Sequence, residues 1–243
     1  MTCLLVTAGC GLTGSTGAAG HPSAVPLVAL GDSVPAGSNC HCTPFPELSA
    51  RGLSNAAREV TATNDAVNGI STDGVLRQLR DNKPIRQHVA AADVVEVEVG
   101  ANDVPHTDAC GAQVSCYTPG VPPMQARLGA IVRQVRQLTA GRDVRVVLLD
   151  YWSVWLGGAY AQQQGVAYVA AATQVTDVVN KAIQSAAQAT GAAYVDLRAA
   201  FKGPDYAYDE THYLSNDGDH PNAAGHEQIA QALLPVIEPK LPS

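Results

Sequence analysis

The sequence predicts a three-layer α/β/α domain built on a central parallel sheet of five strands. From residue 25 onward, short β-branched runs alternate with longer stretches of helical periodicity. Strands that are separated by helices connect through right-handed crossovers, which produce a parallel sheet with helices on both faces. A length of 243 residues also fits one large α/β domain better than two domains.

Each element follows from its local pattern. The predicted strands are residues 25–30, 60–67, 93–99, 144–149 and 193–197. The fourth run is almost continuously apolar, as expected when helices cover both faces of a strand. Helices are predicted over 46–59, 72–80, 124–138, much of 167–189, and 223–234. The third of these has apolar residues at helical spacing, namely Leu128, Ile131, Val135 and Leu138.

Two acidic residues fit this scheme poorly. Glu96 and Glu98 point to the same side of the third predicted strand, which should be buried. We expect them to lie at an exposed strand end or to pair with nearby arginines. No catalytic role is assigned to either.

Composition and charge exclude several classes of function. Hydrophobic residues make up 46% of the chain and charged residues 15%, which is typical of a globular protein. The formal net charge is −7 and no long run of lysine or arginine occurs, so the usual electrostatic footprint of a nucleic-acid-binding protein is missing. No glycine-rich phosphate loop follows a strand in the form that nucleotide enzymes need.

Residues 1–24 predict a signal or lipoprotein-like segment followed by a flexible linker. A short apolar run precedes Cys10, and a stretch rich in Gly, Ser and Thr follows it. This arrangement resembles the end of a bacterial lipoprotein signal. We therefore expect a secreted or cell-envelope protein of a bacterium, with Cys10 as the candidate lipidation site and membrane contact only through that anchor.

The four cysteines that follow the N-terminal segment predict disulfides. Cys40, Cys42, Cys110 and Cys116 all lie near predicted loops, which fits an oxidising compartment. Four cysteines allow three pairings, among which the local pair Cys110–Cys116 is favoured. The alternative is a metal site on Cys40 and Cys42, but their spacing fits zinc poorly.

Polar and glycine residues gather at the ends of the predicted strands. Gly-Asp-Ser at 31–33 follows the first strand, Asn-Gly at 68–69 the second, and Gly-Ala-Asn-Asp at 100–103 the third; Asp-Gly-Asp-His-Pro at 217–221 precedes the last helix. Each segment alone could be an ordinary cap or turn. Together they supply a nucleophile, a base, a residue that orients the base, and donors for an oxyanion.

This ordered set resembles the SGNH (GDSL-type) hydrolase family, and the resemblance covers residues 25–239 as one domain. It implies a flavodoxin-like arrangement and a serine esterase or lipase that needs no metal and no cofactor. Ser33 is then the nucleophile, His220 the base and Asp217 the orienting acid, three residues before the histidine. The oxyanion hole combines the backbone N–H groups of Ser33 and Gly69 with the Asn102 side chain.

The substrate is less well defined by the sequence. His106 follows the third-strand motif, and Tyr151, Trp152 and Trp155 follow the fourth strand, where they either line an acyl pocket or pack in the core. We expect a small-molecule, lipid or acetylated carbohydrate ester. An acyltransferase with the same triad, and a binding module without activity, are the alternatives. The sequence predicts no oligomeric state.

Overall fold

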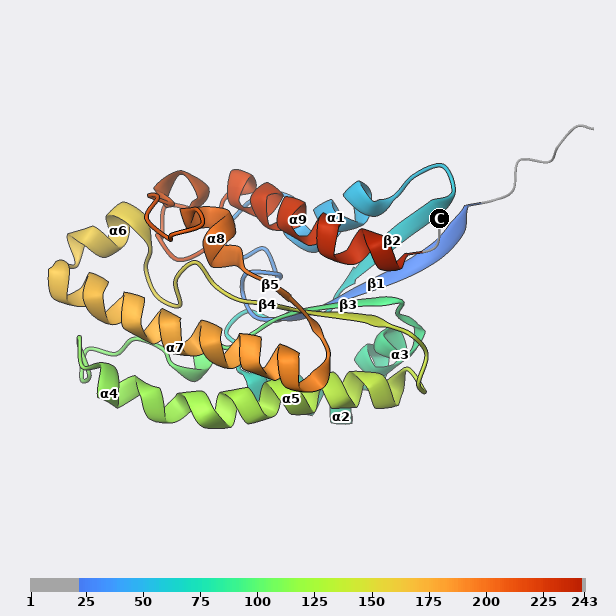
Figure 1. Ribbon diagram of the computed structural model, residues 1–243, viewed down its shortest axis with the longest axis horizontal. Helices are drawn as coiled ribbons and strands as arrows, with labels where there is room; N and C mark the ends of the chain where they lie inside the picture. Colours follow the sequence, from blue (N-terminus) through green and yellow to red (C-terminus); the bar gives the residue numbers. More distant parts are fainter. Residues whose placement is uncertain (1–21, 242–243) are drawn as a thin grey trace, which may run out of the picture.

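The computed structural model describes residues 22–241, and Figure 1 shows their arrangement. Of the segment predicted at 1–24, residues 1–21, with Cys10, lie outside them, whereas Ser23 and Ala24 already belong to the first strand. The five strands are all parallel, in the order β2-β1-β3-β4-β5. This is the flavodoxin-like order, as predicted. The strands are β1 (Ser23–Gly31), β2 (Arg58–Asn64), β3 (Val94–Glu98), β4 (Arg145–Leu149) and β5 (Ala193–Val195).

Helices cover both faces of the sheet. In Figure 1 the helices α1 (Phe45–Leu53), α8 (Leu197–Lys202) and α9 (Ala223–Ile237) lie on one side of the sheet. The other side carries α2 (Thr72–Asp81), α3 (Lys83–Ala91), α5 (Val121–Leu138) and α7 (Val166–Thr190). Two short helices, α4 (Val114–Tyr117) and α6 (Gly158–Gln163), lie in the connections. Among the described residues, no helix is long and apolar enough to span a membrane.

The sheet separates two apolar cores. Val95 and Val97 of β3 belong to the core beneath α5 and α7, whereas Val94 belongs to the core beneath α1 and α9. Successive residues of a strand face opposite sides, so Glu96 and Glu98 share the α1 side with Val94.

The prediction that Glu96 and Glu98 are exposed or paired with arginine is wrong. Both are fully buried, because β3 is a central strand between β1 and β4. Glu96 accepts a hydrogen bond from the Ser49 hydroxyl of α1 at 2.9 Å, and the ion pairs of the described residues include neither glutamate. Burial raises the pKa of Glu96 to about 8 and that of Glu98 well above its ordinary value. Burial therefore favours the protonated form of both carboxyls.

Several element boundaries also differ from the prediction. The helix predicted over 46–59 ends at Leu53, because Ser54 turns extended and its hydroxyl accepts from the Val60 N–H at 2.9 Å. Strand β2 consequently starts at Arg58. At the other edge, β5 stops at Val195, and the Asp196 carboxylate caps an unpredicted helix, α8, by accepting from the Ala199 N–H at 2.7 Å. The short helices α3 and α6 were not predicted either.

The four cysteines within the described residues form two disulfides. Cys40 is bonded to Cys42 and Cys110 to Cys116, with Cα–Cα separations of 5.1 and 5.9 Å. The predicted pairing of Cys110 with Cys116 is confirmed. The first pair lies between β1 and α1, and the second lies just before and within α4.

Candidate active site

The turn after β1 brings Ser33 to the carboxyl edge of the sheet. Gly31 makes this possible: its φ is +149°, and a Cβ there would lie 2.0 Å from the carbonyl oxygen of Glu98. Only glycine lets β1 approach β3 so closely. The topological switch of the sheet lies between these two strands, which is where ligands bind in such folds.

The buried Asp32 side chain holds this turn through two hydrogen bonds. Its Oδ1 accepts from the Val34 N–H at 3.2 Å, and its Oδ2 accepts from the Tyr151 hydroxyl at 2.6 Å. Burial raises the pKa of Asp32 to about 6, although both hydrogen bonds act in the opposite direction. The Ser33 hydroxyl itself makes no hydrogen bond to any other described residue.

His220 is joined to Asp217, as predicted. Its Nδ1 lies 2.7 Å from Asp217 Oδ2. An ionised carboxylate only accepts hydrogen bonds, so Nδ1 carries the proton and Nε2 keeps a free lone pair. An imidazole in this tautomer can take a proton at Nε2, which is what a general base requires.

The Asp217 carboxylate accepts four N–H groups. Oδ1 accepts from the backbone N–H groups of Asp219 and His220, both at 3.1 Å. Oδ2 accepts from His220 and from the side-chain amide of Asn39 at 2.5 Å. Partial burial raises the pKa of Asp217, but the donors outweigh it and lower the pKa to about 2. Asp219 makes no hydrogen bond to the His220 ring, so Asp217 is the aspartate in contact with the imidazole.

A closed loop before α9 holds this pair. Leu214 and Pro221 form an antiparallel bridge, and the Ser215 N–H donates to the His220 carbonyl at 2.8 Å. Asn222 then caps α9 by accepting from the Gly225 N–H at 3.1 Å. The segment that caps α9 therefore also carries His220.

Ser33, His220 and Asn102 line one cavity of about 330 Å³ at the carboxyl edge of the sheet. The remaining lining residues are aromatic, polar and small apolar side chains. Most belong to the connections that follow β1, β3 and β4, as Asp108 does, whereas Tyr168 lies in α7 and Asp219 in the loop before α9. The cavity therefore brings together Ser33, Asn102 and His220, which come from three distant segments. The predicted pocket residues His106, Trp152 and Trp155 line it as well.

Asn102 is held in place while keeping one donor free. Its Nδ2 donates to the Ile70 carbonyl at 3.0 Å, and an amide nitrogen carries a second hydrogen. The next residue, Asp103, is buried and accepts from the Thr72 N–H at 2.9 Å, which caps α2. These contacts fix the loop between β3 and α4 against the start of α2.

Gly69 lies beside this cavity rather than in its lining. Its φ is +75°, a conformation that favours glycine, and its N–H donates to no described residue. A Cβ at this position would meet nothing within 4 Å. The positive φ therefore gives a reason for glycine at position 69, whereas contact with other protein atoms does not.

The predicted aromatic residues both line the cavity and pack in the core. Trp155 is buried, donates its indole N–H to the Val104 carbonyl at 2.8 Å, and meets the His106 ring edge-on at 4.9 Å. Trp152 is buried and stacks on Phe201 at 4.3 Å. These side chains form a rigid wall of the cavity. The predicted alternatives, an acyl-pocket lining and core packing, therefore both apply to them.

Two contacts of this site were not predicted. The contact between Asn39 and Asp217 joins residues 178 positions apart, and no local pattern in the sequence indicates it. Tyr151 was predicted as a pocket residue, but its bond to Asp32 was not.

Comparison with known proteins agrees with this architecture. A lipase from a goat rumen metagenome is 20% identical, with a TM-score of 0.72 over 88% of this chain and 98% of its own. An acetylxylan esterase from Geobacillus stearothermophilus is 17% identical, with a TM-score of 0.62 over 91% of this chain and 98% of its own. A lipase/acylhydrolase from Enterococcus faecalis is 19% identical, with a TM-score of 0.60 over 90% and 97%.

These likenesses show the fold, and a search of curated proteins found no match. The family itself is shown by the sequence. Residues 29–228 match the model of the GDSL-like lipase/acylhydrolase family, a span that runs from within β1 into α9. With that match over most of its length, and with the fold of known hydrolases, the chain belongs to the GDSL-like lipase/acylhydrolase family.

Proposed function

We propose that the protein is a serine esterase that hydrolyses carboxylic esters through an acyl-enzyme on Ser33. The observation that carries the proposal is the 2.7 Å contact between His220 Nδ1 and Asp217, which leaves His220 Nε2 free in the cavity that Ser33 also lines. A serine becomes a competent nucleophile when such a base can take its proton.

The reaction has two halves. In the first, His220 Nε2 takes the Ser33 proton as Oγ attacks the ester carbonyl carbon, and the resulting imidazolium then protonates the departing alcohol. In the second, water attacks the acyl-enzyme, loses a proton to His220, and the acid is released as Ser33 regains its proton. Asp217 holds the imidazole in the required tautomer and stabilises the imidazolium.

The negative oxygen of each tetrahedral intermediate needs donors. The free amide hydrogen of Asn102 and the N–H groups of Ser33 and Gly69 are assigned this role. Preorganised donors of this kind are each worth about 2.7–4 kcal/mol of the barrier. Asn102 is well suited because its amide is already held by the Ile70 carbonyl.

The substrate is proposed to be a small-molecule, lipid or acetylated carbohydrate ester. An acetylxylan esterase is among the structures of similar fold, and the cavity of about 330 Å³ has room for a short acyl chain. We further propose that the protein is exported, in a form with or without a lipid on Cys10. The two disulfides support export, because such bonds persist in oxidising compartments.

The test is Ser33→Ala, assayed on p-nitrophenyl esters of increasing chain length and on acetylated sugars. We expect loss of turnover and of labelling by a fluorophosphonate probe, with an unchanged melting temperature. Retained turnover in the folded variant would overturn the proposal. An added alcohol acceptor distinguishes hydrolysis from acyl transfer, because a transferase would form a new ester.

A further inference from the structure

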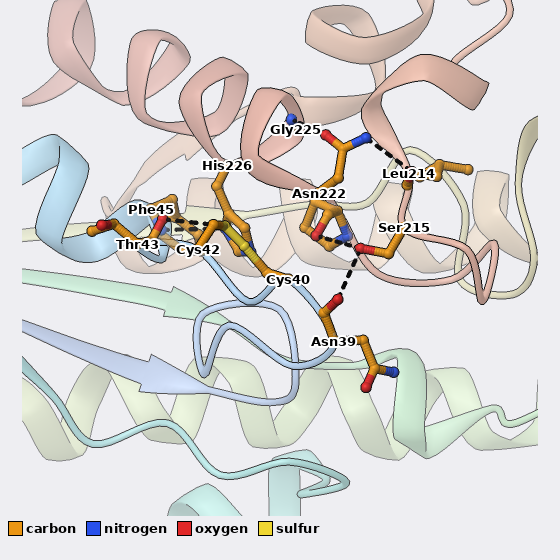
Figure 2. Close-up of a disulfide and its surroundings, with 11 residues drawn as sticks. Asn39, Cys40, Cys42, Thr43, Phe45, Leu214, Ser215, Asn222, Gly225 and His226 are labelled. Atoms are coloured by element: carbon orange, nitrogen blue, oxygen red, sulfur yellow. Dashed lines mark hydrogen bonds between the residues drawn. A yellow bond between two sulfur atoms is a disulfide. The ribbon is translucent and has the colours of Figure 1, made fainter.

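The loop between β1 and α1 contains the Cys40–Cys42 disulfide, which Figure 2 shows beside α9. Only His41 separates the two cysteines. On one side of the pair the chain enters α1, where the Phe45 N–H donates to Nδ1 of the buried His226 at 3.2 Å. That side is therefore fixed to α9.

On the other side of the disulfide, Asn39 reaches the acid of the proposed triad. Its amide donates to Asp217 Oδ2 at 2.5 Å. Its carbonyl accepts from the Ser215 hydroxyl at 3.2 Å, as Figure 2 shows. The side-chain amide and the backbone carbonyl of Asn39 thus both contact the loop that carries His220.

The backbone of this loop has an uncommon conformation. Asn39 has a φ of +58° and His41 a φ of +51°, in the left-handed region that most side chains with a Cβ disfavour and that asparagine tolerates better than most. Such conformations persist only where the surroundings impose them. The bond between Cys40 and Cys42 restricts the backbone angles of His41, which lies between them. It also restricts Cys40, and therefore the backbone that follows Asn39.

We propose that the Cys40–Cys42 disulfide is a positioning element for catalysis, which holds Asn39 so that its amide orients Asp217 toward His220. The inference rests on the proposed function of the triad. Reduction by a dithiol breaks the S–S bond and delivers two electrons and two protons, leaving two protein thiols and an oxidised dithiol. The loop then relaxes, Asn39 leaves Asp217, and the imidazole loses part of its support.

The experiment compares kcat and KM for p-nitrophenyl acetate with and without dithiothreitol, using the full chain. Peptide mapping after alkylation establishes which cysteines are oxidised. We expect reduction to lower kcat by about ten-fold, the effect of losing a hydrogen bond to a charged group, with KM changed by less than about two-fold. Cys40→Ser with Cys42→Ser should have the same low kcat and no response to dithiothreitol.

Two further variants show where the effect originates. Cys110→Ser with Cys116→Ser removes the other disulfide and should retain both the wild-type kcat and the response to dithiothreitol. Asn39→Ala should lower kcat by a similar factor, and reduction should lower it no further, because the disulfide acts through Asn39. Asn39→Ala keeps all cysteines, so the inference stays testable even where the double serine variant fails to fold.

Several results would overturn the inference. Equal kcat in the oxidised and reduced protein is one, and a further ten-fold loss when Asn39→Ala is reduced is another. Free thiols at 40 and 42 with stoichiometric zinc in the native protein would also do so, since ligand atoms of these cysteines and His226 lie within 4.8 Å of one another. Failure of the proposed function gives a different result: the oxidised wild type would neither turn over ester nor label at Ser33.

Discussion

The Tyr151 hydroxyl donates to the Asp32 carboxylate at 2.6 Å, which ties the end of β4 to the turn that carries Ser33. Both side chains are buried, so no water replaces this bond in the folded protein. The turn is thereby connected to a strand that contributes no residue to the proposed triad.

Tyr151→Phe should lower both stability and activity. Leaving the buried Asp32 without this donor costs about 1–3 kcal/mol and raises its pKa further. We expect a kcat about ten-fold lower, because a displaced turn misplaces the Ser33 hydroxyl. Chemical denaturation and steady-state kinetics measure the two effects.

Tyr194→Phe is the matched control for Tyr151→Phe. Tyr194 donates to the buried Asp150 at 2.5 Å, one strand further from the nucleophile. The Tyr194→Phe variant should lose a comparable amount of stability but keep the wild-type kcat. A similar fall of kcat in both variants would mean that activity merely follows stability.

Asp217→Asn should lower kcat by at least about 100-fold, because an amide can present its N–H to His220 and favour the wrong tautomer. Asp219→Asn should change kcat little, since Asp219 makes no hydrogen bond to the His220 ring. Both variants are compared at the pH optimum of the wild type. The opposite ranking would assign the orienting role to Asp219.

Asn102→Ala should lower kcat by about 100- to 1000-fold while KM changes far less, because the amide donates to the oxyanion only in the transition state. The variant also loses the bond to the Ile70 carbonyl, so its melting temperature has to be measured alongside. A rise of KM with unchanged kcat would instead assign Asn102 to substrate binding.

Stability should fall as the pH rises from 6.5 to 8. Burial raises the pKa of Glu96 to about 8 and that of Asp150 to about 7, whereas carboxyls of the unfolded chain ionise near pH 4. In this window the folded protein holds protons that the unfolded chain has lost, so raising the pH favours unfolding. His226, with its pKa lowered by burial to about 4, acts in the opposite direction only below its ordinary value of 6.5.

Glu96→Gln should weaken this pH dependence, since an amide does not titrate. Glu96 contributes at most about 2 kcal/mol across the window, because one retained proton changes the free energy of unfolding by about 1.4 kcal/mol per pH unit. Glu59→Gln, at an exposed position of β2, is the control. A melting temperature that stays constant from pH 6.5 to 8 in the wild type would refute the assignment.

The sequence alone determined the order of the five strands and of the helices α1, α2, α5, α7 and α9, together with the segments that bear Ser33, Asn102 and His220. Apolar periodicity reports which face of an element is buried, and glycine and polar residues mark where it ends, so local patterns are enough for these features. The spacing of Asp217 and His220 is also local, and the structure places them in contact.

Only the tertiary structure decided which distant groups meet. The burial of Glu96 and Glu98 depends on β3 lying between two other strands under α1, which no residue of β3 encodes by itself. The contact of Asn39 with Asp217 depends on a loop after the first strand meeting a loop before the last helix. Hydrogen bonds and burial depend on which residues are neighbours in space. A local sequence pattern does not report contacts between residues that are far apart along the chain.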